Sequence, residues 1–217
     1  MSSNIINLLW ESFLETILMV GVSGGLGAAI GIPLGVFLFV TSPKGIMPKP
    51  YVNRIIGTIV NAVRSTPFII LLVAIIPFTR LIVGSSIGTV AAIVPLTIAA
   101  APLIARLVET SLREVDKGLI EAAQSMGATN TQIICKVLLP EAMSGILAGL
   151  TIAFVALVGS SAMAGAVGGG GLGDMGIRYG YQRFMPEVMA AVVIILIVFV
   201  QSLQSFGDWM VRRVSHR

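Results

Sequence analysis

The stretch EAAQSMGATNTQIICKVLLPEA, residues 121–142, lies between long apolar runs and is too polar to cross a lipid bilayer. Its pattern is that of two short helices joined by a turn. Asp116 can cap the first helix, and Gly127 stands where a helix end favours a residue that tolerates positive φ. Thr129 opens a capping-box pattern, TNTQ, for the second helix. The sequence therefore predicts a helix–turn–helix segment over residues 114–140, outside the lipid.

Each of these predicted helices carries an apolar stripe at helical spacing. The stripe of the first helix comprises Leu119, Ala122, Ala123 and Met126, and that of the second comprises Ile133, Ile134, Val137 and Leu138. So short a segment cannot bury all of these side chains within itself. They pack either against the ends of the protein's own helices or against another protein. The residues alone leave both possibilities open.

Composition places most of the chain in a membrane. Of its 217 residues, 56% are hydrophobic and 11% are charged, and the mean hydropathy is +0.97. A soluble domain has about 25% charged residues. Apolar runs of about 20 residues can span a bilayer, and a backbone in lipid satisfies its own hydrogen bonds by forming helices. The sequence predicts an all-α membrane protein with five transmembrane helices, at about residues 14–42, 55–79, 86–112, 141–166 and 187–210.

Residue content excludes several other classes. A single cysteine, Cys135, excludes an intramolecular disulfide framework and a cysteine cluster for metal, and we expect no metal site. The first apolar run follows Glu11 and Glu15 without any Lys or Arg, so we do not expect a cleaved signal peptide. The net charge of +4 indicates basic loops at the bilayer surface rather than nucleic-acid binding.

The distribution of basic residues predicts the orientation. With the C-terminus inside, the cytoplasmic segments hold Lys44, Lys49, Arg54, Arg113, Lys117, Lys136, Arg212, Arg213 and Arg217. The other side then holds only Arg80, Arg178 and Arg183. We therefore expect the N-terminus outside, and the segment 114–140 and the C-terminus in the cytoplasm.

Four residues are candidates for a pathway or gate, namely Arg64, Ser160, Ser161 and Met163. A charged residue within a span usually faces protein or water, so Arg64 either extends to the interface or faces the bundle interior. The two serines suit either a pathway or ordinary helix packing. They do not indicate a protease, because the single histidine, His216, lies next to the C-terminus. No catalytic residues are therefore assigned.

The run GGGGLG, residues 168–173, formally matches a nucleotide-binding glycine pattern. It follows a membrane span rather than a strand, so it does not predict a nucleotide site. We expect a tight bend or hinge at the outer end of the fourth span.

The spacing within the opening stretch resembles a family signature: EAA, three residues, Gly, nine residues, Ile, one residue, LP. This signature is typical of the integral membrane subunits of binding-protein-dependent ABC importers. The matching positions are Glu121, Ala122, Ala123, Gly127, Leu139 and Pro140, with Val137 where the pattern usually has Ile. In that family the segment is a coupling helix that docks into a groove of a separate ATPase subunit. The stretches RSTPFIILLVAIIPFTR, AAIVPLTIAAAPLIARLVE and SAMAGAVGGGGLGDMGIRYGY resemble the methionine-uptake permeases in particular.

The resemblance covers nearly the whole chain and implies a type I ABC importer fold. It implies one transmembrane domain, residues 13–204, with the coupling helix between spans 3 and 4. The implied partners are a second copy, two cytoplasmic ATPase subunits and an extracytoplasmic methionine-binding protein, in the bacterial inner membrane. The chain would be a transport subunit for D- or L-methionine, not an enzyme, with no cofactor of its own because ATP binds the ATPase.

Two alternative functions remain open at the level of sequence. The first is an ABC permease for another amino acid or small solute. The second is a channel or secondary transporter that needs no ATPase. Acidic residues within the membrane would favour ion coupling, and the predicted spans have almost none.

Overall fold

The structure is a computed structural model that describes residues 3–215. His216 and Arg217, and the predictions made for them, lie outside the described residues. Within residues 3–215 the chain forms only helices and their connecting turns. The helices are α1 (Ser3–Val40), α2 (Pro50–Ser65), α3 (Phe68–Ala74), α4 (Ile76–Val83), α5 (Thr89–Arg113), α6 (Lys117–Ser125), α7 (Asn130–Ile133), α8 (Leu139–Glu141), α9 (Met143–Ala164), α10 (Gly171–Met175) and α11 (Pro186–Val214), with π-helical turns η1 (Ile134–Leu138), η2 (Gly165–Gly169) and η3 (Gly176–Gln182).

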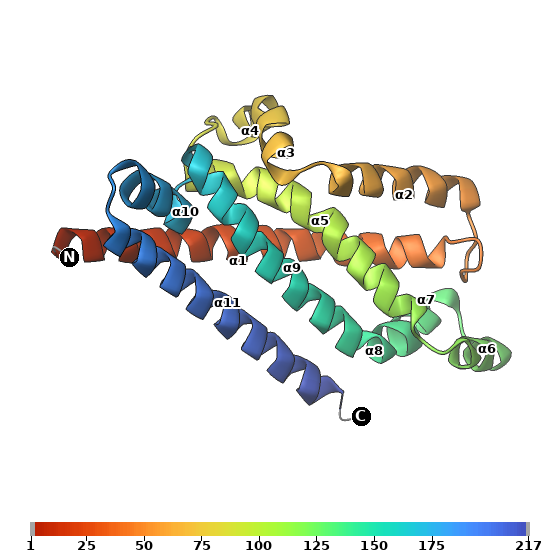
Figure 1. The fold of residues 1–217 in the computed structure, drawn as a ribbon. Coiled ribbons are helices and arrows are strands. Elements are labelled where there is room, and N and C mark those ends of the chain that lie inside the picture. The colour runs from red at the N-terminus through yellow and green to blue at the C-terminus, as the bar shows by residue number, and fades with distance from the viewer. Residues whose placement is uncertain (1–2, 216–217) are drawn as a thin grey trace.

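Four long helices, α1, α5, α9 and α11, form an elongated bundle, and α2 lies along it (Figure 1). The N-terminal end of α1 and the C-terminal end of α11 lie at opposite ends of this bundle. Helices α6, α7 and α8 gather at the end where α11 finishes, whereas α3, α4 and α10 lie toward the other end. By length and hydropathy the four long helices can each cross a bilayer, and a bent pair, α2 with α3, can provide a fifth crossing.

Helix α5 is the centre of the bundle because α1, α9 and α2 all pack against it, α1 most extensively. Three glycines of α1, each four residues from the next, face α5: Gly27, Gly31 and Gly35. A Cβ at Gly31 would lie 2.7 Å from the carbonyl oxygen of Ala101, and one at Gly35 would lie 2.5 Å from that of Ala105. Small residues at this spacing let two helix backbones approach closely, which is how helices associate in lipid without a hydrophobic driving force.

The second predicted span, residues 55–79, is broken rather than continuous. Helix α2 ends at Ser65, and α3 begins at Phe68 after a bend of 105°. Pro67 causes the break, because it forces Thr66 into an extended conformation with φ −80° and ψ 124°. A second break at Ile75 separates α3 from α4.

The glycine run after α9 forms the predicted tight bend. Gly168, Gly170 and Gly171 have φ values of +92°, +79° and +73°, which favour glycine over other residues. Two side chains of α1 hold the turn: Glu15 Oε2 accepts a hydrogen bond from Gly171 N at 2.6 Å, and Thr16 Oγ1 accepts one from Leu172 N at 2.9 Å. The bend therefore fixes the end of α9 to the first helix.

Candidate functional site

The segment between α5 and α9 has the predicted helix–turn–helix form, and we call residues 114–140 the coupling segment. Asp116 caps α6, since its Oδ1 accepts a hydrogen bond from Gly118 N at 2.6 Å. Gly127 follows α6 with φ +76°, and the next amide, Ala128 N, donates to Ala123 O at 3.1 Å. These features are those of a helix closed by a left-handed glycine. The turn predicted at Gly127 is confirmed.

The second part of the coupling segment begins with the predicted capping box. Thr129 Oγ1 accepts a hydrogen bond from Gln132 N, and Gln132 Oε1 accepts one from Thr129 N at 2.9 Å. Helix α7 then widens into η1, where Leu139 N donates to Ile134 O, five residues back. Helix α8 begins at Leu139, and Pro140 in its first turn has no amide hydrogen to donate.

The apolar stripes of the coupling segment are divided between the protein's own core and the surface. Ala123 is 4% exposed, and Ile133 and Leu138 are fully buried in the main core. Leu119 and Met126, by contrast, are 43% and 81% exposed. Helix α6 thus packs against the core through Ala123 and the half-buried Ile120, whereas Leu119, Ala122 and Met126 face outward.

The signature residues accordingly occupy two environments. Glu121, Ala122, Gly127 and Pro140 are exposed, Val137 and Leu139 are half-buried, and Ala123 is buried. Beside α6 lies a hollow of about 180 Å³ between that helix and the loop that follows α1. Glu121 and Lys117 of α6 and Lys44 of the loop line it. The free face of the coupling segment thus combines exposed apolar side chains with charges of both signs.

The four candidate pathway residues do not gather at one site. Arg64 lies in the last turn of α2 and is exposed. Ser161 is 1% exposed and its Oγ donates to Val158 O at 2.8 Å, so it packs within the protein. Ser160 is half-buried, and Met163, three residues further along the same side of α9, is 52% exposed.

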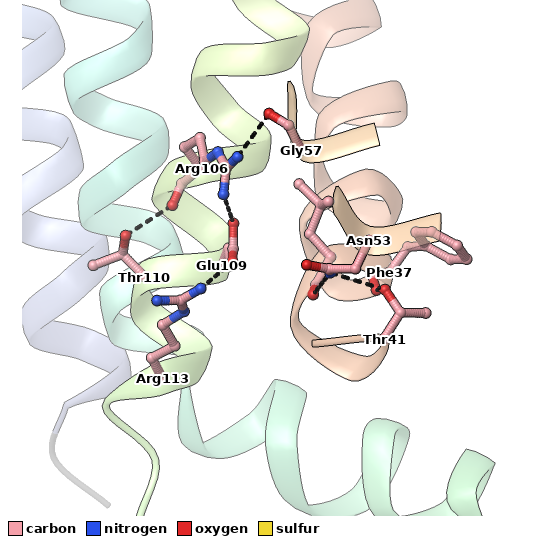
Figure 2. A network of polar contacts seen from close by, with 9 residues as sticks. Phe37, Thr41, Asn53, Gly57, Arg106, Glu109, Thr110 and Arg113 are labelled. Carbon is pink, nitrogen blue, oxygen red and sulfur yellow. Dashed lines mark hydrogen bonds and ion pairs between the residues drawn. The ribbon is translucent and has the colours of Figure 1, made fainter. Parts of the chain in front are cut away.

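One polar cluster was missed by the sequence interpretation, which counted almost no acidic residues in the spans. Glu109 of α5 is 3% exposed, and its carboxylate binds Arg106 and Arg113 of the same helix, each at 2.5 Å (Figure 2). Arg106 Nη2 also donates to Gly57 O of α2 at 3.0 Å. The i, i+3 and i, i+4 spacing of these residues was the available signal. The cluster neutralises a buried carboxylate and attaches α2 to α5.

Residues 31–216 match the protein family described as the binding-protein-dependent transport system inner membrane component. The chain belongs to this family. It is thus a multi-pass inner-membrane protein and a permease subunit of an ABC importer.

Related members of the family are similar over most of the chain. The probable D-methionine transport system permease protein MetI of Vibrio cholerae is 57% identical over 211 residues, covering 97% of this chain and 94% of the relative. The D-methionine transport system permease protein MetI of Escherichia coli K12 is 54% identical over 165 residues, 76% of each chain.

Solved structures show the same fold. A chain from inward-facing conformations of the MetNI methionine ABC transporter has a TM-score of 0.97 and 52% identity, and each chain is covered to 99%. A chain from an amino acid ABC transporter crystallised with histidines has a TM-score of 0.79 at 20% identity, which shows the fold alone. The predicted all-α, type I importer fold is confirmed.

Proposed function

We propose that two copies of this chain form the translocation pathway for methionine, D or L, of an ATP-driven importer. The transmembrane domain is residues 13–204. The 57% identity to the Vibrio cholerae protein over 97% of the chain carries the assignment of substrate. Two cytoplasmic ATPase subunits and one extracytoplasmic methionine-binding protein complete the assembly, and ATP binds the ATPase subunits rather than this chain.

The coupling segment is the proposed docking site for the ATPase. Its free face exposes Leu119, Ala122 and Met126 beside Glu121. Large apolar side chains on a protruding helix favour a protein partner, and the neighbouring charges favour orientation of that partner. Ala123, Ile133 and Leu138 anchor the same segment in the core, so a force on α6 would be transmitted to the ends of α5 and α9.

The proposed orientation follows from the two ends of the bundle. Lys44, Lys49, Arg113, Lys117 and Lys136 belong to the end that carries the coupling segment, and Arg80, Arg178 and Arg183 belong to the other end. Because basic residues mark cytoplasmic loops, the coupling segment and the C-terminus are cytoplasmic and the N-terminus is outside.

The mechanism is alternating access between an outward-open and an inward-open bundle. ATP binding closes the ATPase pair and draws the two coupling segments together, which favours the outward-open state. Hydrolysis and product release restore the inward-open state. A ligand shifts such an equilibrium only by the difference in its affinity for the two states, and a shift from 1:99 to 99:1 requires about 5.5 kcal/mol. The candidates Arg64, Ser160, Ser161 and Met163 remain proposed pathway or gate residues.

The experiment is uptake of labelled methionine into vesicles that contain the complete importer. We expect ATP-dependent uptake that unlabelled L- and D-methionine inhibit and an unrelated amino acid such as lysine does not. An ATPase variant unable to hydrolyse ATP is the control and should not support uptake. Uptake without ATP would indicate an autonomous channel, and ATP-dependent uptake of labelled lysine without uptake of labelled methionine would indicate another substrate.

A further inference from the structure

Helix α2 rests on the bundle through a narrow face. Asn53 Nδ2 donates to Leu38 O of α1 at 2.6 Å, and Gly57 O accepts from Arg106 of α5 (Figure 2). Gly57 and Val60 are the buried residues of this helix. The other residues of α2 are exposed or half-buried. The chemistry of the exposed side chains therefore indicates whether lipid, water or protein lies next to each side of the helix.

The exposed surface of α2 is divided into two stripes of different chemistry. One is apolar, at spacings of three and four residues, and comprises Val52, Ile55 and Ile59. The other is polar, at spacings of four, three and four residues, and comprises Arg54, Thr58, Asn61 and Ser65. We call the second set the polar stripe.

From Arg54 at its cytoplasmic end, the polar stripe is long enough to extend through about half of the hydrocarbon core. With a rise of about 1.5 Å per residue, the 16 residues of α2 are about 24 Å long, and the stripe is about 16 Å long. The hydrocarbon core is about 30 Å thick. The apolar stripe can therefore contact lipid along α2, whereas the polar stripe requires water or polar protein groups.

Only part of the polar stripe is satisfied by its own helix. The hydroxyls of Thr58 and Ser65 donate to Arg54 O and Asn61 O, each at 2.8 Å. Within residues 3–215, no side chain forms an ion pair with Arg54. The stripe also lies on the side of α2 next to α5. Asn53 contacts α1, and Gly57, four residues later and about 40° further around the helix, contacts α5. Asn61 lies about another 40° around in the same direction, just past the contact with α5.

We propose that the polar stripe of α2 lines a water-filled translocation pathway, facing the second copy of the chain. This inference rests on the proposed function, because the pathway carries a zwitterionic amino acid. Thr58, Asn61 and Ser65 offer hydroxyl and amide groups to that solute. Arg54 lies near the N-terminal end of α2, on the side of the bundle that carries the coupling segment, and offers a cation to the carboxylate of the solute.

The test uses single cysteines in the assembled importer held in nanodiscs, where both faces are open to solvent. In a Cys135→Ser background, Thr58→Cys and Asn61→Cys report the polar stripe, and Ile55→Cys and Ile59→Cys are the matched controls on the apolar stripe. The reagent is a methanethiosulfonate with a quaternary ammonium group, which reacts with thiols in water and is excluded from lipid. Rates are measured without nucleotide and with a non-hydrolysable ATP analogue.

We expect the two polar-stripe cysteines to react at least tenfold faster than the controls in at least one nucleotide state. Labelling Asn61→Cys should also reduce methionine uptake into vesicles at least twofold. Equal rates on the two stripes, or unreactive polar-stripe cysteines in both states, would overturn the proposal. Fast, stripe-specific labelling without any methionine uptake by the unlabelled background would support the aqueous stripe and overturn the proposed substrate instead.

Discussion

Substitution of Gly35 by alanine tests the close packing of α1 on α5. The added Cβ would lie 2.5 Å from Ala105 O, and ordinary contacts begin at 3.4 Å, so the two backbones must separate by about 0.9 Å at this point. Overpacking of a well-packed core costs about 1–3 kcal/mol. Alanine is the better helix former by about 0.5–1 kcal/mol, so the net loss for Gly35→Ala is smaller.

Gly25→Ala is the matched control on the same helix, because a Cβ there meets no atom within 4 Å. Gly25→Ala should raise the free energy of unfolding through the higher helix propensity of alanine, without the loss from overpacking. The midpoint of thermal unfolding of the detergent-purified protein measures both variants, with roughly 2–4 °C per kcal/mol for a chain of this size. We expect Gly35→Ala to unfold several degrees below Gly25→Ala. Equal midpoints would contradict the close approach of α1 and α5.

Three further substitutions test the coupling segment and the Arg–Glu cluster. Gly127→Val should abolish most methionine uptake while the protein still inserts in membranes, because valine is strained at a φ of +76°. Gly127→Asn is the control and should retain uptake, because asparagine tolerates positive φ. Equal uptake by the two variants would count against the turn at this position. Glu121→Lys should weaken co-purification of the ATPase by reversing an exposed charge on α6, and unchanged binding and uptake would show that the ATPase does not contact this position. Glu109→Gln should destabilise the protein by about 1–3 kcal/mol. This loss is smaller than that for breaking a fully buried ion pair, because the side chain of Arg113 is 61% exposed and water screens its charge. Asp174→Asn, whose partner Arg178 is 55% exposed, is the control and should cost about 0–1 kcal/mol in the same thermal measurement; similar losses would contradict a special role for Glu109.

Features that depend on neighbouring residues were predictable from the sequence. The cap at Asp116, the turn at Gly127 and the capping box at Thr129 each involve groups within five residues of one another. The apolar runs likewise predicted the long helices, because a backbone in lipid has few alternatives. The type I importer fold came from the resemblance carried by the coupling segment.

Features that depend on how helices dock were not predictable to the same degree. Ala122 and Ala123 are adjacent and identical, yet only Ala123 is buried, and this follows from the orientation of α6 on α7 and η1. Pro67 disfavours helix at Thr66 and so marks a break in the second span, but the 105° angle of the bend depends on how α2 and α3 pack. The glycines of α1 and the Arg106–Glu109 pair were visible as spacings, but their significance required the approach of α5.

The central claim is that this chain works as the membrane half of an ATP-driven importer through its coupling segment. The most direct measurement is gentle affinity purification from native bacterial membranes, with the amount of each co-purified subunit determined. The account predicts an ATPase subunit in a 1:1 ratio with this chain, in a particle large enough for two copies of each. Recovery of the chain alone, under conditions that keep other membrane complexes intact, would contradict it.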